Sequence, residues 1–294
     1  MICLTINIRD RTQLNWDIQL QMPDFVRLIC FLKNSYLKDY KNMDVKLNKI
    51  ATCSCILLIY ASLGNTNQIN FFIAGGPGFS TLKNTRLVEI NEEMTNAYNT
   101  IPHTNRQSFW AIGAHHALEH FSLPSYQLSL GLAGYFFHLG QVKGTEYPFI
   151  NEGFFDTLDY SFHAKSVSLM MEAKAVFSPY ALKPYALIGI GSGWNKFYAY
   201  NEKPTDPTLS AAPAMFFNNH TQQIFSYELG AGIQYLLKDD PLRHVQYYAS
   251  AGYQYFNLNK GSLGPSPAQA SSDRIKVKNL YTQGIIFTLA LSLG

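Results

Sequence analysis

The chain has 294 residues, of which 15% are charged and 14% aromatic, and its formal net charge is +3. Few charged and many aromatic residues exclude an intrinsically disordered chain. A run of about 18 apolar residues is absent, which excludes a protein that crosses the membrane with several helices. Residues 1–64 carry 8 Lys or Arg against 5 Asp or Glu, whereas 15 of each follow from Asn65 onward. The body of the protein is therefore neutral, and nothing in its charge predicts a nucleic-acid partner.

The first 64 residues have the layout of a secretory signal preceded by extra sequence. Residues 43–49 supply a start and two lysines, 50–63 form an apolar run, and small residues precede a cleavage point before Asn65. We interpret 43–64 as a signal peptide and 1–42 as a mis-assigned translation start or a disordered extension. The alternative is a genuine cytosolic extension in which 50–63 is a buried core segment. All four cysteines lie before residue 56 and would be lost with the signal.

The remaining chain, 65–294, shows apolar residues with a period of two, the signature of β-strands. At 223–236, for example, one face is large and apolar while the other is mainly small and polar. The same alternation is seen at 127–136, 166–177, 245–256 and 280–293. The stretches 68–79, 108–120 and 184–200 are also strand-like, with less clearly separated faces, which gives eight predicted strands.

The connections between these strands alternate between long and short, as in an antiparallel up-and-down barrel with long loops at one end. A soluble eight-stranded barrel would present Lys and Glu on the face opposite its apolar one. Here that face is rich in Ser, Gly, Ala, Thr and Gln, which suit the narrow interior of a small barrel. The sequence therefore predicts an all-β, eight-stranded transmembrane β-barrel with its apolar face toward lipid and a non-barrel N-terminal segment.

Four glycine- and aromatic-rich segments carry a family resemblance: Phe71–Gly78, Pro184–Gly191, Glu228–Tyr235 and Ala251–Tyr255. With them, the chain resembles the small outer-membrane β-barrel proteins of Gram-negative bacteria, both porin-like and adhesin-like. The resemblance implies an outer-membrane location and contact with outer-membrane lipid, lipopolysaccharide and the assembly machinery. Family members usually end in an aromatic residue, whereas this chain ends in Leu293-Gly294, with Leu293 in the outward register.

Three short motifs suggest a zinc site, a nucleotide-binding loop and a lipid deacylase site, but their position on predicted strands or their spacing argues against each. His116 and His120 fit the H-x-x-E-H zinc pattern, but on a strand they would lie about 13 Å apart. The glycines at 189–193 lack the spacing and following helix of a nucleotide loop. Ser161 and His163 are residue types used by lipid deacylases, but their spacing does not match that family's motif. We expect no metal site, no cofactor and no catalytic residues.

Two groups of residues are candidate functional positions. Glu172, Lys174 and Glu228 fall on inward faces, where a buried charge is costly unless paired. We expect Lys174 to form an interior ion-pair network with one or both glutamates. Met215, Phe216 and Phe217 form an apolar triplet in a polar loop. It is a candidate contact for lipid headgroups or a partner, and the alternative is packing on the barrel rim.

The leading functional hypothesis is a structural or surface-interaction role in the outer membrane. The long loops would contact a host ligand, a phage or another envelope component, because loops on a rigid scaffold commonly carry binding function. A narrow porin-like channel is the second hypothesis. A lipid-modifying enzyme on the same scaffold is the third.

Overall fold

The structure is a computed structural model that describes residues 68–83, 85–100, 103–118, 125–152, 156–177, 181–206, 208, 215–267 and 272–294. The interpreted signal peptide, the sequence upstream of it and the four cysteines lie outside these residues, as do Glu119 and His120. Within the described residues, no helix is long and apolar enough to cross a membrane.

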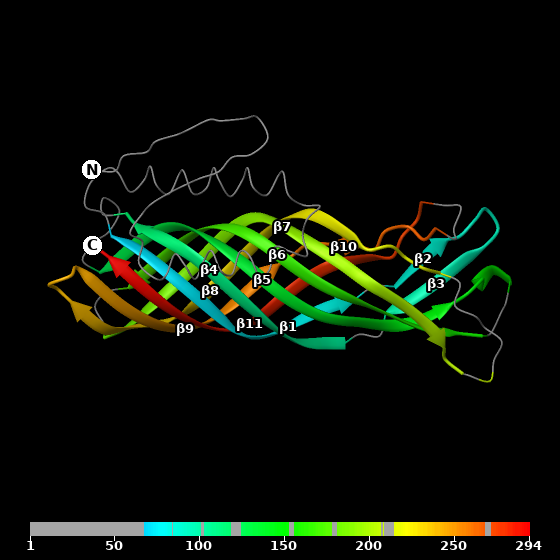
Figure 1. The fold of residues 1–294 in the computed structure, drawn as a ribbon, viewed down its shortest axis with the longest axis horizontal. Coiled ribbons are helices and arrows are strands. Elements are labelled where there is room, and N and C mark those ends of the chain that lie inside the picture. Colours follow the sequence, from blue (N-terminus) through cyan, green and yellow to red (C-terminus); the bar gives the residue numbers. More distant parts are fainter. Residues whose placement is uncertain are drawn as a thin grey trace, which may run out of the picture. The chain divides into compact units, whose positions relative to one another are not determined.

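Eight strands of the described chain form a closed ring (Figure 1). Each pairs antiparallel with the next strand of the ring, and the first and last pair with each other through Ile69 and Leu293. The predicted eight-stranded up-and-down barrel is confirmed. Its strands are β1 (Ile69–Lys83), β4 (His103–Ala117), β5 (Tyr126–Tyr147), β6 (Leu158–Phe177), β7 (Leu182–Pro204), β8 (His220–Asp240), β9 (Val245–Asn257) and β11 (Lys276–Leu293).

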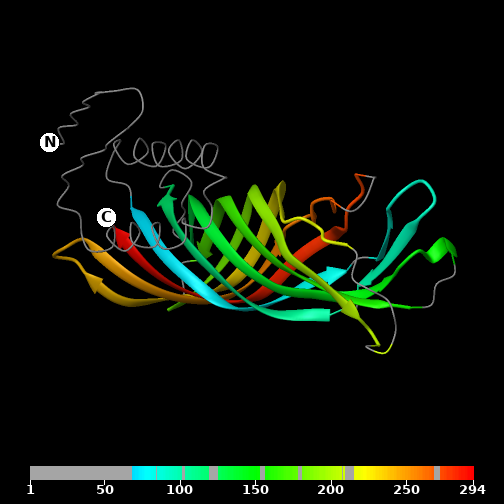
Figure 2. The same cartoon turned by 45° about the vertical axis from the view of Figure 1, so that its right-hand side comes forward.

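The long connections contain more regular structure than the sequence predicted. Strands β2 (Thr85–Glu89) and β3 (Thr95–Thr100) form a hairpin whose second strand pairs with the far end of β5. The hairpin lies at the end of the barrel opposite the C-terminus (Figure 2). A 3-10 turn, η3 (Ile150–Glu152), and a short strand, β10 (Gly261–Ser262), complete this end. We call it the long-loop end and the other the short-turn end.

Strands β5 and β6 also run further than predicted, so 137–147 and 158–165, which lie outside the predicted strands 127–136 and 166–177, are strand. The predicted strands 127–136 and 166–177 end where the outward side chains cease to be apolar. The strands continue because their inward side chains still alternate into a packed interior, as Val142, Tyr160 and Phe162 show with at most 2% exposure.

The apolar face of the barrel points outward, as predicted. Ile188 is 55% exposed, whereas Leu187 beside it is 7% exposed and faces the interior. On β8, outward apolar residues run from Phe225 to Tyr235, which is ten residues or about 33 Å along the strand. A tilt of about 40° reduces this to a height of about 25 Å, the height of the apolar band in outer-membrane barrels.

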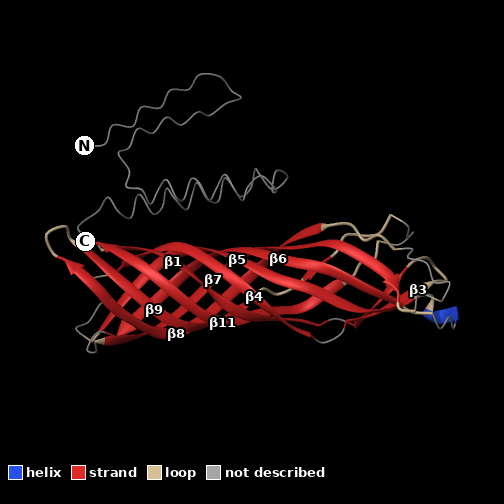
Figure 3. Cartoon of the chain, turned by 60° about the horizontal axis from the view of Figure 1, so that its bottom comes forward, coloured by secondary structure: helices blue, strands red, loops and turns tan. Residues whose placement is uncertain are grey.

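An aromatic-rich row marks the upper edge of this band on four neighbouring strands. Trp110, Phe136, Val167 and Trp194 stand opposite one another across β4 to β7. Figure 3 shows how these strands wind obliquely around the barrel. Because the ring of strands is closed, the described strands have no unpaired edge inside this band. A hydrocarbon environment requires this, since it offers no partner for unpaired backbone N–H and C=O groups. This is the architecture of a transmembrane β-barrel.

The middle of the barrel interior is filled by four aromatic rings, which we call the aromatic plug. Phe256 of β9 reaches across the lumen to Tyr135, Phe137 and Phe109, with ring centroids 4.8, 4.9 and 5.7 Å away. All four side chains are at most 3% exposed. Toward the long-loop end the same core continues through Leu139, Phe162, Phe197 and Leu258.

Candidate functional site

The short-turn half of the lumen holds a polar cluster arranged around two glycines. Gly131 stands between His115 and Glu172 across neighbouring strands, and Gly189 stands between Glu172 and Glu228. A Cβ atom on Gly131 would lie 2.3 Å from His115 Cδ2, and one on Gly189 would lie 2.2 Å from Glu228 Oε1. Because glycine has no side chain, the larger residues on either side can meet above it.

Glu172 is the centre of this cluster. Its Oε2 atom lies 2.6 Å from His115 Nε2, and its Oε1 atom accepts a hydrogen bond from Tyr135 Oη at 2.8 Å. Glu228 is fully buried, and neither of its carboxyl oxygens has a hydrogen-bond partner among the residues that the structure describes. The structure therefore brings Glu172 and Glu228 to the same part of the lumen, as expected, with His115 as an unexpected third member.

Lys174 lies in the lumen as expected, but its contacts are different from those predicted. Its Nζ atom donates to Gln234 Oε1 at 2.8 Å and lies 4.6 Å from the centroid of the Tyr185 ring. In the described chain, Glu172 has His115 as its close partner in the lumen, and the expected ion pair of Lys174 with a glutamate is not formed. The reason is register: Lys174 stands two residues nearer the short-turn end, whereas His115 reaches Glu172 directly over Gly131.

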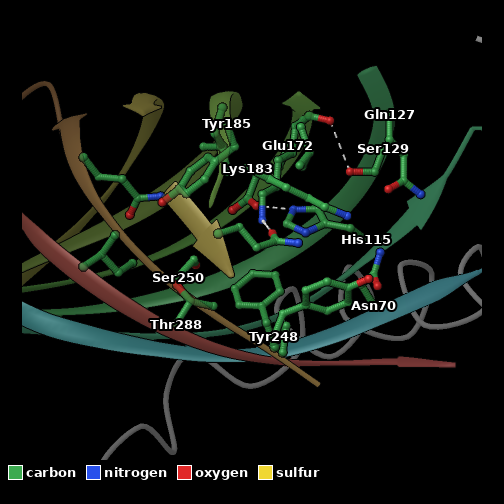
Figure 4. Close-up of a pocket in the computed structure, with 18 of the residues that line it drawn as sticks. Asn70, His115, Gln127, Ser129, Glu172, Lys183, Tyr185, Tyr248, Ser250 and Thr288 are labelled. Atoms are coloured by element: carbon green, nitrogen blue, oxygen red, sulfur yellow. Dashed lines mark hydrogen bonds and ion pairs between the residues drawn. The ribbon is translucent and has the colours of Figure 1, made fainter. Parts of the chain in front are cut away.

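A cavity of about 50 Å³ adjoins this cluster at the short-turn end. Figure 4 shows its lining, which includes His115, Glu172, Lys183, Tyr185 and Ser250. A polar space of this size holds a few water molecules. It does not have the volume of a ligand pocket for a drug-sized molecule.

A chain of amide side chains lies at the short-turn mouth of this cavity. Gln68, just before β1, accepts a hydrogen bond from Gln127 Nε2 at 3.2 Å and donates to Gln246 Oε1 at 3.1 Å. Its partners stand at the starts of β5 and β9, on opposite sides of β1 in the ring. Tyr248 Oη also donates to Gln246 Oε1. These hydrogen bonds span the part of the short-turn mouth between β5, β1 and β9.

The long-loop end is closed by its own folded core. Met215 and Phe217 are each 4% exposed, whereas Phe216 between them is 65% exposed. The Phe217 ring packs on Tyr200 and Tyr98, with centroids 5.0 and 5.8 Å apart. Met215 and Phe217 therefore follow the alternative of packing at the rim, and only Phe216 is exposed as a contact residue would be. The segment is extended, so alternate side chains turn inward onto the tyrosines.

Beneath Met215 lies a carboxyl cluster that the sequence did not reveal. Glu146 accepts hydrogen bonds from Asn96 Nδ2 at 2.6 Å and Tyr98 Oη at 2.8 Å. Tyr200 Oη donates to Glu202 and lies 3.4 Å from Glu146 Oε2, and the backbone N–H of Met215 donates to Glu202 at 3.2 Å. The two carboxyl groups thereby tie β3, β5 and β7 to the segment after β7.

This cluster stands outside the apolar band, because Glu146 is ten residues beyond Phe136 on β5. Burial, together with the neighbouring Glu202 carboxyl group, raises the pKa of Glu146 to about 9. Glu146 is therefore protonated in the folded protein at neutral pH, which lets the two carboxyl groups lie together without full charge repulsion.

The stability of the long-loop end is expected to fall as pH rises from about 5 to 9. Since the folded-state pKa of Glu146 is raised above its ordinary value of 4.5, the folded protein binds this proton more tightly than the unfolded protein. The resulting stabilisation is complete below the ordinary pKa and is lost as pH rises through about 9. Hydrogen exchange of the β3 amides, corrected for intrinsic rates, measures it.

The Glu146→Gln variant serves as the control for this pH dependence. It keeps the shape and hydrogen-bonding capacity of the side chain but has no proton to lose. Its β3 amides should show a much flatter pH dependence. An equal slope in both proteins would mean that another group controls the stability of this end.

The other motifs of the sequence lie on ordinary strands. Ser161 and His163 are both on the outward face of β6, and the His163 ring stacks on Tyr198 with centroids 5.7 Å apart. Gly189 and Gly191 lie within β7 and allow close approach of neighbouring strands. In the described ranges, no group of three or more His, Cys, Asp or Glu side chains could hold a metal ion.

The comparisons with known proteins find similarity in structure but not in sequence. No protein-family model and no curated protein matches the chain. Neisserial surface protein A is 10% identical, with a TM-score of 0.34, over 76% of this chain and 96% of its own. OprG of Pseudomonas aeruginosa is 13% identical, with a TM-score of 0.33, over 75% and 95%. The outer-membrane protease OmpT of Escherichia coli is 9% identical, with a TM-score of 0.36, over 78% and 97%.

Proposed function

We propose that the protein is a non-conducting barrel of the bacterial outer membrane that presents its long-loop end as a contact surface. The outward apolar band, its aromatic-rich upper row and the closed ring of strands support the membrane placement. Short turns face the periplasm in such barrels, so the long-loop end would face outward from the cell. The proposal assigns no catalytic role to the barrel.

The closed lumen is the observation that carries this proposal over a channel. Side chains fill or partly span the interior at three levels: the chain of amides around Gln68, the aromatic plug and the core around Phe217. An eight-stranded barrel has room for little more than its own side chains. A solute crossing the barrel would have to displace buried aromatic rings and the hydrogen bonds of Glu146.

Purified barrel reconstituted in planar bilayers is therefore expected to give no stable conductance steps. A large-pore porin in the same lipid serves as the positive control for insertion and recording. Regular steps of fixed size from the wild-type protein would overturn the closed-barrel proposal. They would then support the alternative of a narrow channel for small solutes.

The contact role is supported by apolar side chains exposed at the long-loop end. Leu87, Tyr147 and Ile150 are 58%, 41% and 46% exposed. Leu87 and Tyr147 stand on either side of Ala97 across the hairpin and β5, so they belong to one surface. Exposed apolar groups on a polar rim are typical of contact sites for host or envelope ligands.

Cells displaying the Leu87→Ser/Tyr147→Ser double variant should adhere several-fold less well to epithelial monolayers than cells displaying the wild-type barrel. Leu242→Ser is the matched control, because Leu242 is 93% exposed but lies in the short turn between β8 and β9. Equal adhesion of the wild-type and double-variant cells, at equal surface amounts, would count against this surface as the contact site.

A further inference from the structure

A row of basic residues lies directly beyond the aromatic-rich row on the outer wall of the barrel. His138, Lys165 and Lys196 stand opposite one another across β5, β6 and β7. Each is two residues, or about 7 Å along the strand, from its counterpart in the row of Phe136, Val167 and Trp194. The outer surface changes there from apolar to cationic in one step.

The next row adds groups that extend this site. His163 and Tyr198 stand opposite each other there. Lys165 Nζ and Lys196 Nζ lie 5.3 and 5.9 Å from the centroid of the Tyr198 ring, so the two ammonium groups flank one aromatic side chain. Arg106, exposed and outward on β4, adds a third permanent cation to the same region.

Acidic residues on these strands leave the cationic character of the site intact. Beyond the aromatic-rich row, β5 and β7 carry Glu146 and Glu202, and both face the interior. On β6, Asp159 faces outward but lies six residues from Lys165, which is about 20 Å along the strand. The site is therefore a local concentration of positive charge at the edge of the apolar band.

We propose that Lys165 and Lys196, with His138, His163 and Tyr198, bind a phosphate group of a phosphorylated lipid in the outer leaflet. The inference rests on the proposed outer-membrane placement. Headgroup phosphates lie immediately above the hydrocarbon, where this row stands. Lysine ammonium groups bind phosphate as point charges, and the Tyr198 hydroxyl and imidazole N–H groups supply further donors.

The test measures binding of bisphosphorylated lipid A, and of the same lipid after phosphatase treatment, to the full barrel in detergent. Native mass spectrometry counts the bound lipid, and Trp194 fluorescence reports occupancy beside the site. The Lys165→Gln/Lys196→Gln variant should bind bisphosphorylated lipid A at least tenfold more weakly than the wild type. The matched control is Lys276→Gln/Lys278→Gln, which removes two exposed lysines from β11 and should stay within twofold.

Two further arms separate the sources of phosphate and the causes of failure. Inorganic phosphate at millimolar concentration should compete weakly; if it bound as tightly as lipid A, the lipid assignment would be wrong. Equal binding of lipid A with and without phosphate would overturn the site altogether. Should the glutamine variant not fold, Lys165→Arg/Lys196→Arg must retain binding and Lys196→Gln alone must weaken it.

The proposed function and this inference fail in different ways. Heat-modifiable migration of the wild-type protein from an outer-membrane fraction tests the membrane placement without reference to lipid A. The wild-type barrel could fractionate with the outer membrane while the Lys165→Gln/Lys196→Gln variant binds lipid A as tightly as the wild type. That result would leave the membrane placement intact. It would remove only the phosphate site.

Discussion

Replacing Phe256 with alanine is expected to lower the free energy of unfolding by about 3–5 kcal/mol, the range for buried aromatic residues. Phe256 is fully buried and its ring contacts three rings from the opposite wall of the barrel. Hydrogen bonds hold β9 between β8 and β11, so the walls cannot close over the space left behind. Equilibrium urea unfolding in detergent micelles, followed by tryptophan fluorescence, measures the change.

Phe225→Ala provides the matched control for this variant. Phe225 lies on the neighbouring strand β8 but faces outward and is 59% exposed. Its removal takes contacts mainly from detergent rather than from protein, so the loss of stability should be clearly smaller. Equal losses from the two variants would mean that the aromatic plug contributes no more than the outer face.

Replacing His115 with alanine is expected to cost about 3–5 kcal/mol, the usual effect of leaving a buried carboxylate without its partner. Glu172 would keep the hydrogen bond from Tyr135 but would lose its 2.6 Å contact with His115. It would also still face Glu228 across Gly189. The same unfolding measurement applies, and His115→Ala/Glu172→Gln should recover part of the loss because the second change removes the unpaired charge.

Lys174→Met distinguishes this network from the one that the sequence predicted. Lys174 donates to the neutral Gln234 rather than to a glutamate, and its stem is long enough for methionine to replace most of its packing. Its loss of stability should therefore be well below that of His115→Ala. A larger loss for Lys174→Met would restore the ion pair between Lys174 and Glu172 as the dominant interaction.

The strands and their two faces could be predicted because alternation along one strand needs no knowledge of its neighbours. Leu229 and Glu228 illustrate this: the alternating pattern of 223–236 assigned the first to lipid and the second to the lumen, and the structure places them so. The inward position of Glu172 followed from the same pattern. Its partner did not, because His115 is 57 residues away and meets it only through the register of β4, β5 and β6.

The long-loop end was less predictable for the same reason. Glu146 and Glu202 lie in or next to segments expected as loops, and no local pattern relates them. Only the extended β5 and β7, with the hairpin beside them, bring these carboxyl groups together. The choice between contact and rim packing stayed open for Met215 and Phe217, because an apolar triplet in a polar loop does not reveal which of its members alternate inward.

The extension of β5, β6 and β7 past the aromatic-rich row separates two parts of the protein that can change independently. These strands continue for about ten residues, or about 33 Å, which a tilt of about 40° converts to a height of about 25 Å. Leu87 and Tyr147 are thereby held clear of the headgroup layer on a hydrogen-bonded wall. Substitutions at this tip can alter what it contacts without disturbing insertion, and the lipid-facing band can adapt to a different membrane without altering the tip.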